Sequence, residues 1–107
     1  MKIVGVAACI TGVAHTYMAQ EAIEQECKKR GIECKVETQG GMGIENELEE
    51  DEIAEADVVI MAVAIGIEGE ERFEEKEDEG RVLTLNPSEL IRNPAAAIDK
   101  AIELAQQ

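Results

Sequence analysis

The stretch that decides the fold is Ile3-Val4-Gly5-Val6-Ala7-Ala8, followed directly by Cys9-Ile10-Thr11-Gly12-Val13-Ala14-His15-Thr16. Its first part is a continuous apolar run, which is typical of a central parallel strand that is covered on both faces. From Tyr17 onward the pattern changes to that of an amphipathic helix. The sequence therefore predicts a strand, a short loop and a helix in immediate succession.

The loop between this strand and this helix carries a thiol at Cys9, a glycine at Gly12, two hydroxyl groups and the only histidine, His15. A loop that runs from a parallel strand into a helix gathers backbone N–H groups and the positive end of the helix dipole, and this arrangement binds phosphate. The same environment stabilises the thiolate form of a cysteine. We therefore expect Cys9 to hold a phosphoryl group.

The helix after the loop is predicted to run from about Ala14 to Arg30. Basic residues in its last turn suit the negative end of the helix dipole, and Gly31 supplies the stop. Its apolar residues form two adjacent rows at i, i+4 spacing, and the two rows together make one apolar face. These rows are Ala14, Met18 and Ala22, and Ala19, Ile23 and Cys27.

The segment from Ile32 to Gln39 alternates between apolar and polar residues, which predicts a half-exposed strand at an edge of the sheet. A flexible, glycine-rich turn from Gly40 to Gly43 follows this strand. The side of the strand that is expected to face solvent consists of Glu33, Lys35, Glu37 and Gln39.

The rest of the chain continues the alternation of helices and strands. A short acidic helix is expected from about Leu48 to Ala56, and an apolar strand from Asp57 to Ala64. The acidic segment from Glu68 to Gly80 is interpreted as solvated surface. Another strand is expected from Arg81 to Leu85. The last helix is predicted to begin at Asn93-Pro94, a cap followed by a first-turn proline.

This alternation predicts a single α/β domain over residues 1–107, with a four-stranded parallel sheet in the order 2-1-3-4 and helices on both faces. In such sheets ligands bind beyond the carboxyl ends of the strands, where the winding direction reverses. For this strand order that place is the loop that begins at Cys9. Gln39 and Gly40 follow the carboxyl end of the neighbouring strand, so they are candidates for a second loop near the site.

Composition limits the classes of partner. The formal net charge of -14 repels nucleic acid and anionic membrane surfaces, so neither is expected to bind. No segment has the roughly 18 apolar residues that a membrane span needs. The three cysteines, Cys9, Cys27 and Cys34, have no C-x-x-C spacing, which predicts no metal site and indicates a reducing, cytoplasmic setting. Cys27 and Cys34 are expected in the core, and nothing in the sequence predicts a cofactor.

The stretch from Cys9 to Ala22 resembles the phosphocysteine loop of fructose-type enzyme IIB domains, which belong to the bacterial phosphoenolpyruvate-dependent sugar phosphotransferase system. The stretch from Glu37 to Leu48 resembles a second signature of this family, and Arg72-Phe73 continues the match. The resemblance implies that Cys9 accepts a phosphoryl group from a phosphohistidine on an enzyme IIA partner. It also implies that Cys9 passes this group to a fructose-like sugar in the membrane-embedded enzyme IIC, through which alone the domain meets the membrane.

The resemblance further implies that the loop around Cys9 binds the phosphoryl group, and for several residues an alternative stays open. Thr11 either contacts the phosphate or starts the turn, and Gly12 either lets the backbone approach the anion or only permits the backbone angle. His15 either donates to the phosphoryl group or bonds nearby backbone, and Thr16 is interpreted as a helix-start hydroxyl in preference to a ligand. The candidate loop residues are Ile10, Thr11, Gly12, Val13, Ala14, His15 and Thr16.

The sequence departs from the family pattern at three places. Ile10 stands where the family usually has proline, which restores a backbone N–H and loosens the loop. Ala64 stands where the family commonly has aspartate, at the end of a strand. The acidic segment 68–80 also differs, which alters a surface that partners could use.

Two other functions compete with this interpretation. A low-molecular-weight cysteine phosphatase uses a cysteine, five residues, an arginine and a hydroxyl residue, but here His15 and Thr16 follow Cys9 at that spacing. The arginine that would clamp the phosphoryl group in the transition state is therefore missing. A flavin carrier needs aromatic residues beside the flavin, and the chain has only Tyr17 and Phe73.

Overall fold

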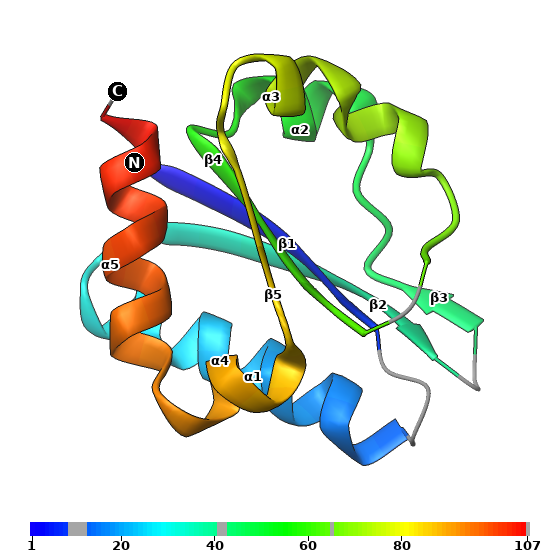
Figure 1. Ribbon diagram of the computed structural model, residues 1–107, viewed down its shortest axis with the longest axis vertical. Helices are drawn as coiled ribbons and strands as arrows, with labels where there is room; N and C mark the ends of the chain where they lie inside the picture. The colour runs from blue at the N-terminus through cyan, green and yellow to red at the C-terminus, as the bar shows by residue number, and fades with distance from the viewer. Residues whose placement is uncertain (9–12, 41–42, 65, 107) are drawn as a thin grey trace.

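A twisted β-sheet forms the middle layer of the molecule (Figure 1). The computed structural model describes residues 1–8, 13–40, 43–64 and 66–106. Within them the sheet has five strands in the order β3-β2-β1-β4-β5. The strands are β1 (Lys2–Ala8), β2 (Glu33–Gly40), β3 (Gly43–Glu45), β4 (Val58–Val63) and β5 (Val82–Leu85).

The four longer strands are parallel to their neighbours, so the predicted order 2-1-3-4 is confirmed for β2, β1, β4 and β5. The predicted count of four strands is wrong, because the short β3 pairs antiparallel with the end of β2. Gly43 has a φ of 93°, which an L side chain rarely adopts, so glycine lets the chain turn back here. The predicted edge position of β2 is therefore wrong along Thr38–Gly40, where β3 covers it.

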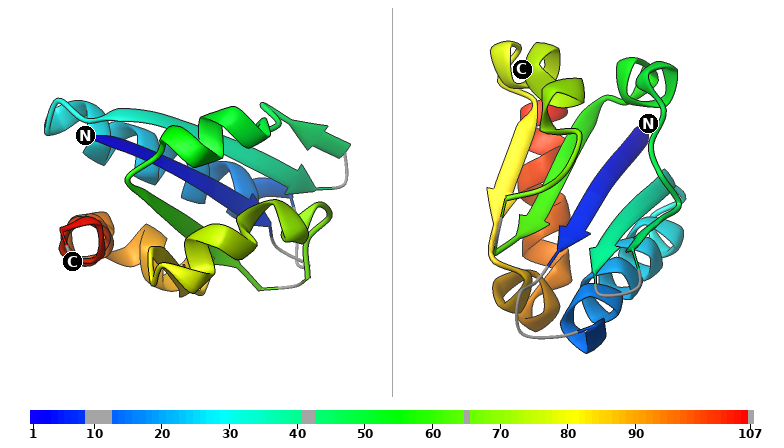
Figure 2. Two further views of the ribbon diagram at one scale, coloured as in Figure 1. Left: turned by 90° about the horizontal axis from the view of Figure 1, so that it is seen from above. Right: turned by 90° about the vertical axis from the view of Figure 1, so that its right-hand side faces the viewer.

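Helices cover both faces of this sheet, as predicted (Figure 2). One face packs against α1, α4 and α5, and the other against α2 and the short η1 and α3 that follow β4. The helices are α1 (Val13–Lys29), α2 (Glu50–Glu55), the 3₁₀ helix η1 (Glu70–Phe73), α3 (Glu74–Asp78), α4 (Pro87–Arg92) and α5 (Pro94–Ala105).

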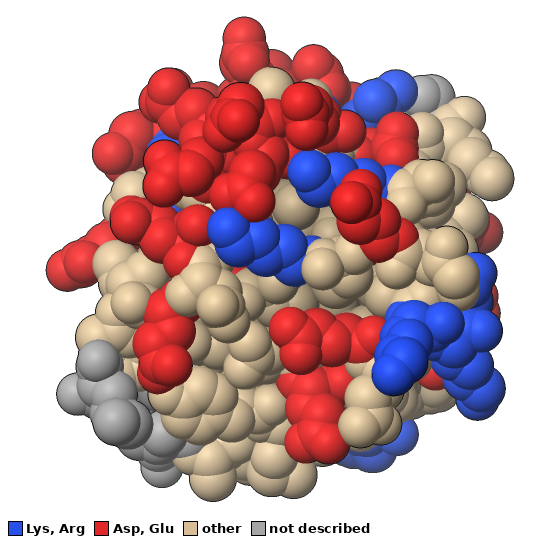
Figure 3. All heavy atoms as spheres, turned by 180° about the vertical axis from the view of Figure 1, so that it is seen from behind, with Lys and Arg blue, Asp and Glu red and all other residues tan. Residues whose placement is uncertain are grey.

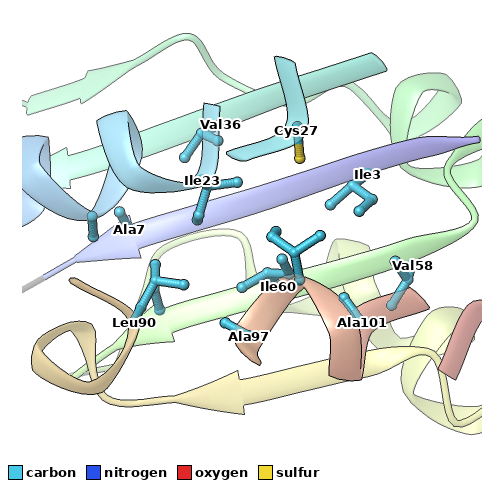
Figure 4. Close-up of a cluster of buried hydrophobic side chains, with 13 residues drawn as sticks. Ile3, Ala7, Ile23, Cys27, Val36, Val58, Ile60, Leu90, Ala97 and Ala101 are labelled. Carbon is cyan, nitrogen blue, oxygen red and sulfur yellow. The ribbon is translucent and has the colours of Figure 1, made fainter. Parts of the chain in front are cut away.

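The core on the α1 side is aliphatic. Ile3, Ile23, Ile60 and Ile98 are fully buried there, between the sheet and the three helices (Figure 4). On the other face a second cluster contains Val4, Val6, Leu48 and Phe73. The sheet is thus buried on both faces, which explains the continuous apolar runs of β1 and β4.

Only one of the two apolar rows of α1 faces the sheet. Ala19, Ile23 and Cys27 are fully buried, whereas Ala14 is exposed and Met18 is 47% exposed. The predicted apolar face is therefore buried only in part, because α1 rests on β1 and β2 mainly along the row of Ala19, Ile23 and Cys27. In the second row only Ala22 is half-buried.

Two Asn-Pro pairs start the last two helices. The Asn93 side chain accepts a hydrogen bond of 3.2 Å from the Ala96 backbone N–H, which confirms the predicted start of α5. The Asn86 side chain accepts one of 2.9 Å from Ser88 N–H and starts α4, a helix that the sequence analysis left out.

The different exposure of the two rows of α1 gives a direct test of this packing. Ile23→Ala should lower the free energy of unfolding by about 2–5 kcal/mol, because it leaves a cavity between α1 and the sheet. Met18→Ala on the same helix should change it by less than about 0.5 kcal/mol. Urea denaturation measures both values, and equal losses for the two variants would contradict the described packing.

Candidate functional site

The strands β1, β2 and β4 end together at one edge of the sheet. Ala8, the last residue of β1, lies opposite Gln39 of β2 and Val63 of β4. The backbone N–H of Ala64 donates a hydrogen bond of 3.1 Å to the carbonyl of Ala8. This carboxyl edge is where the sequence analysis expects the ligand. Cys9, Ile10, Thr11 and Gly12 lie outside the described residues.

The first turn of α1 lies at the same edge, because the helix begins at Val13 (Figure 1). A helix of 17 residues directs its N-terminal N–H groups and the positive end of its dipole toward this place. Within this turn Ala14 is exposed, His15 is half-buried and Thr16 is buried. The edge therefore offers a negatively charged group a favourable field.

Two buried hydroxyl groups lie beneath this edge. Thr16 is 1% exposed and Thr38 is 2% exposed, and among the described residues neither Oγ1 atom has a hydrogen-bond partner. A Cβ atom added to Gly40 would lie 4.0 Å from Thr16 Oγ1, so the end of β2 and the start of α1 are close together. The structure thus brings Thr16 and Gly40, both candidate site residues, to one place.

Gln39 uses its whole side-chain amide to hold the segment after β4. Its Oε1 atom accepts a hydrogen bond of 2.8 Å from the Glu68 backbone N–H, and its Nε2 atom donates one of 2.9 Å to the Glu68 carbonyl. Nε2 also donates to Glu37 Oε2 at 2.6 Å. Gln39 was predicted to face solvent, but it is half-buried because of these contacts.

Glu37 is fully buried, contrary to its predicted place on the solvent side of β2. Its carboxylate accepts hydrogen bonds from Arg72 Nη1 at 2.9 Å, Arg72 Nη2 at 3.0 Å and the Leu48 backbone N–H at 2.8 Å, besides the one from Gln39. The prediction fails because the segments 46–48 and 68–72 fold back over this face of the strand. The alternation of β2 identified the face correctly, but it carries no information on what covers that face.

The Glu37–Arg72 pair is charged at neutral pH. Burial alone would raise the pKa of Glu37, but the hydrogen bonds from Arg72, from Leu48 N–H and from Gln39 outweigh burial and hold this pKa below its usual value. The same pairing raises the pKa of Arg72. A buried carboxylate with a full set of donors is therefore stable in its ionised form.

Lys35 is the third polar side chain on this face of β2. Its Nζ atom lies 2.9 Å from both carboxylate oxygens of Glu52 in α2, and it donates to the Glu47 carbonyl at 3.1 Å. Lys35, Glu37 and Gln39 thus connect one strand to two later stretches of the chain, residues 47–52 and 68–72.

A contact between Tyr17 and Glu45 joins the start of α1 to β3. The Tyr17 hydroxyl donates a hydrogen bond to the Glu45 carboxylate. This hydrogen bond, with the negative charge of Glu45, raises the pKa of Tyr17 above its usual value of 10.0. The β2–β3 hairpin is therefore fixed beside the first turns of α1.

Cys27 and Cys34 lie far down the sheet from this edge and belong to the core, as predicted. Cys27 is fully buried, and Cys34 packs against the same cluster. A hydrogen bond with Cys27, together with burial, raises the pKa of Cys34, so this thiol stays neutral. Cys27 is fully buried and Cys34 is neutral, so neither thiol is placed to attack a substrate.

Acidic side chains gather at the end of the molecule where α2 and α3 lie (Figure 3). A groove of about 540 Å³ runs between α2 and the η1–α3 segment there, and it is lined mainly by carboxylates. Among the described residues, no group of three or more metal-ligating side chains lies close enough together to hold a metal ion. Within the same part of the chain, no helix has the length and apolar character required to cross a bilayer.

With this geometry in place, comparison with known proteins identifies the family. The family described as "PTS system, Lactose/Cellobiose specific IIB subunit" matches residues 4–100. The chain belongs to the IIB family of the sugar phosphotransferase system (PTS).

Three relatives show how close the likeness of this IIB chain is. The PTS system fructose-like EIIB component 2 of Escherichia coli (strain K12) is 48% identical over 99 residues, which are 92% of this chain and 90% of the relative. The fructose-like PTS system EIIBC component of the same strain is 49% identical over 72 residues, which are 67% of this chain and 15% of the relative. The crystal structure of a domain from a fructose-specific IIABC component of Borrelia burgdorferi has a TM-score of 0.85 and 48% identity, and the match covers 95% of this chain and 93% of that chain.

The resemblance to fructose-type IIB domains is therefore confirmed, and with it a role in sugar phosphotransfer. The second signature of the IIB chain, from Glu37 to Leu48, contains both ends of a buried contact, since Glu37 accepts a hydrogen bond from Leu48 N–H. Arg72, which continues the match, is the ion partner of Glu37. Only the family resemblance pointed to Arg72, because composition and periodicity show an arginine in an acidic segment and nothing more.

The buried ion pair predicts a pH-dependent loss of stability. Arg72→Met should lower the free energy of unfolding by about 3–5 kcal/mol at neutral pH, because Glu37 stays buried without its cation. The pKa of Glu37 is depressed in the native protein, so its stabilising effect is present above the usual carboxyl pKa of 4.5 and is lost as pH falls through its lower native pKa. The gap between wild type and variant should therefore shrink in acid.

The control for this measurement is Arg30→Met. Arg30 pairs with Glu26 and Asp99 at the surface, and loss of such exposed pairs should cost much less than loss of the buried pair. Urea denaturation at several pH values gives all three curves. If the gap for Arg72→Met stayed constant from neutral to acid pH, Glu37 would not be the group that the arginine keeps ionised.

The Tyr17–Glu45 contact can be followed by ultraviolet absorbance, because the chain has one tyrosine and no tryptophan. Tyrosinate formation in the wild type should have its midpoint above 10.0, as the carboxylate of Glu45 opposes a second negative charge. Glu45→Gln should shift the midpoint down toward that value. Unchanged titration in Glu45→Gln would show that the contact does not persist in solution.

Proposed function

We propose that this IIB chain is a phosphoryl relay, in which Cys9 accepts a phosphoryl group from a phosphohistidine on an IIA partner. Cys9 then passes this group to a sugar that the membrane-embedded IIC partner holds. The proposal rests on the position of Cys9 in the sequence. Cys9 directly follows Ala8, the last residue of the central strand β1, and β1 ends at the edge that faces the N-terminus of α1. This place suits a thiolate and an anionic ligand alike.

The first step forms an S–P bond and breaks a P–N bond. The thiolate of Cys9 attacks phosphorus in line with the bond to the histidine nitrogen, and the imidazole leaves with the electron pair of that bond. In the second step a sugar hydroxyl attacks phosphorus, and its proton passes to water or to a base of the IIC partner. The S–P bond then breaks, and the thiolate of Cys9 is restored.

Backbone donors around the cysteine are proposed to stabilise the charge on the phosphoryl oxygens during both steps. We assign this role to the loop residues Ile10, Thr11, Gly12, Val13, Ala14, His15 and Thr16. The dipole of α1 supports the assignment because its positive end points to the edge where β1 ends, just before these residues in the sequence.

The names of two relatives support the partners. One relative is named an EIIBC component, and the other structure comes from a IIABC component, both fructose-like or fructose-specific. We infer that the present IIB chain serves a fructose-like sugar and works in the cytoplasm against the inner side of a IIC protein. The family description names lactose and cellobiose, so the choice of sugar is assigned to IIC and not to this chain.

The relay is tested by transfer of a labelled phosphoryl group from phosphoenolpyruvate through the general PTS proteins and a fructose-type IIA. Wild type should take up one label per chain, and Cys9→Ser should take up none. Cys27→Ser, which changes a core thiol, should keep the label and serves as the matched control. Label on His15 in place of Cys9 would overturn the assignment.

Turnover of p-nitrophenyl phosphate distinguishes the relay from a cysteine phosphatase. A relay must keep its phosphorylated form from reacting with water, so we expect negligible release of p-nitrophenol. Sustained release that depends on Cys9 would favour the phosphatase instead.

A further inference from the structure

Three hydrogen bonds fix the orientation of the Gln39 amide group at the end of β2. Both hydrogens of Nε2 are used, one toward Glu37 Oε2 at 2.6 Å and one toward the Glu68 carbonyl at 2.9 Å. Oε1 accepts from Glu68 N–H at 2.8 Å. Reversing the amide would turn its oxygen toward a carboxylate and a carbonyl, so only one orientation satisfies the contacts. Glu37 is itself held in place by Arg72.

The segment that Gln39 holds lies on the opposite side of the carboxyl edge from α1. Val36 of β2 packs in the core on the α1 side, whereas Glu37 contacts Leu48, which belongs to the core on the other side. Side chains alternate along a strand, so Gln39 projects to the same side as Glu37. The segment 66–69 is therefore attached to β2 on the face that α1 does not cover.

The same segment is tied to the strand end that precedes Cys9. Ala64 N–H donates to the Ala8 carbonyl at 3.1 Å, and Gln39 is the register neighbour of Ala8. The chain after β4 is thus held to Ala8 at residue 64 and to Gln39 at residue 68. The end of β1 lies between the first turn of α1 on one face and this held segment on the other.

We propose that Gln39 is a positioning residue for phosphoryl transfer: it fixes the segment 66–69 as the wall of the site that stands opposite α1. This inference rests on the proposed function of Cys9. Transfer between a phosphohistidine and a thiolate needs the two atoms in line with phosphorus, and a displacement of about 1 Å can lower such a rate by about 100-fold. A wall held at residues 64 and 68 limits that displacement.

The test is Gln39→Met, which keeps the length of the side chain and removes its three hydrogen bonds. The rate of phosphorylation of Cys9 is measured in single turnovers against the concentration of phosphorylated IIA. We expect the maximal rate to fall by about tenfold or more. The IIA concentration that gives half of this rate should not change, because the wall positions the reacting atoms and does not bind the partner.

Lys35→Met is the matched control. Lys35 lies on the same face of the same strand and also makes three hydrogen bonds, but it holds Glu52 and the Glu47 carbonyl, away from the carboxyl edge. It should lower the free energy of unfolding as much as Gln39→Met does, without lowering the maximal rate. This pair separates an effect on the site from a general loss of stability.

Gln39→Glu is the second variant and serves if Gln39→Met fails to fold. It keeps an acceptor for Glu68 N–H but loses both donated hydrogen bonds and places a second carboxylate beside Glu37. The maximal rate of phosphorylation of Cys9 should again fall in Gln39→Glu. In Gln39→Met, hydrogen exchange at the Glu68 amide should be faster than in wild type. Either result would support a positioning role for Gln39.

The inference fails if the maximal rates of the Gln39 variants equal that of wild type, or fall no further than that of Lys35→Met. It also fails if only the half-saturating concentration of IIA changes, since the segment would then bind the partner. These outcomes differ from failure of the relay itself, in which wild type takes up no label on Cys9 and the variants have no rate to compare.

Discussion

The carboxylate of Glu37 is the group on which the arrangement of this molecule depends. It is fully buried, and an ionised carboxylate in that position is stable only with a complete set of donors. Arg72 supplies two of them, and Leu48 N–H and Gln39 supply the others. Each donor comes from a different part of the chain, so satisfying one charge fixes the segment before α2, the 3₁₀ helix η1 and the end of β2 relative to one another.

Because the Glu37 network lies on one face of the sheet, the two faces contribute differently to the carboxyl edge. On one face α1 presents its N-terminus, and the core beneath it is aliphatic. On the other face Glu37 and Gln39 hold the covering segments beside the carboxyl edge by directional hydrogen bonds. One face thus supplies an electrostatic field and the other supplies shape. The proposed relay needs both, because the field favours the anion and the shape sets the line of transfer.

The sequence was sufficient for the four parallel strands and their order, because continuous apolar runs and a glycine stop mark buried strands and helix ends. It was insufficient for β3, which has three residues and no apolar pattern. The helix α4 was predictable, since Asn86-Pro87 carries the same start signal as Asn93-Pro94. The burial of Glu37 was not predictable from the sequence. Alternation along β2 shows which side chains share a face, but it does not show whether solvent or another segment covers that face.

The hydrogen bonds of Arg72 favour a relay over a phosphatase. A guanidinium group has five N–H donors, and all five of Arg72 are used: Nε on the Gly69 carbonyl, and the two Nη atoms on Glu37 and on the carbonyls of Leu48 and Glu68. This arginine therefore has no donor left to clamp a phosphoryl group in a transition state for attack by water. Its charge is also neutralised by Glu37, so in the proposed relay Arg72 adds no ion pair to a phosphorylated Cys9. Transfer of the phosphoryl group to the next protein then does not require an ion pair with Arg72 to be broken.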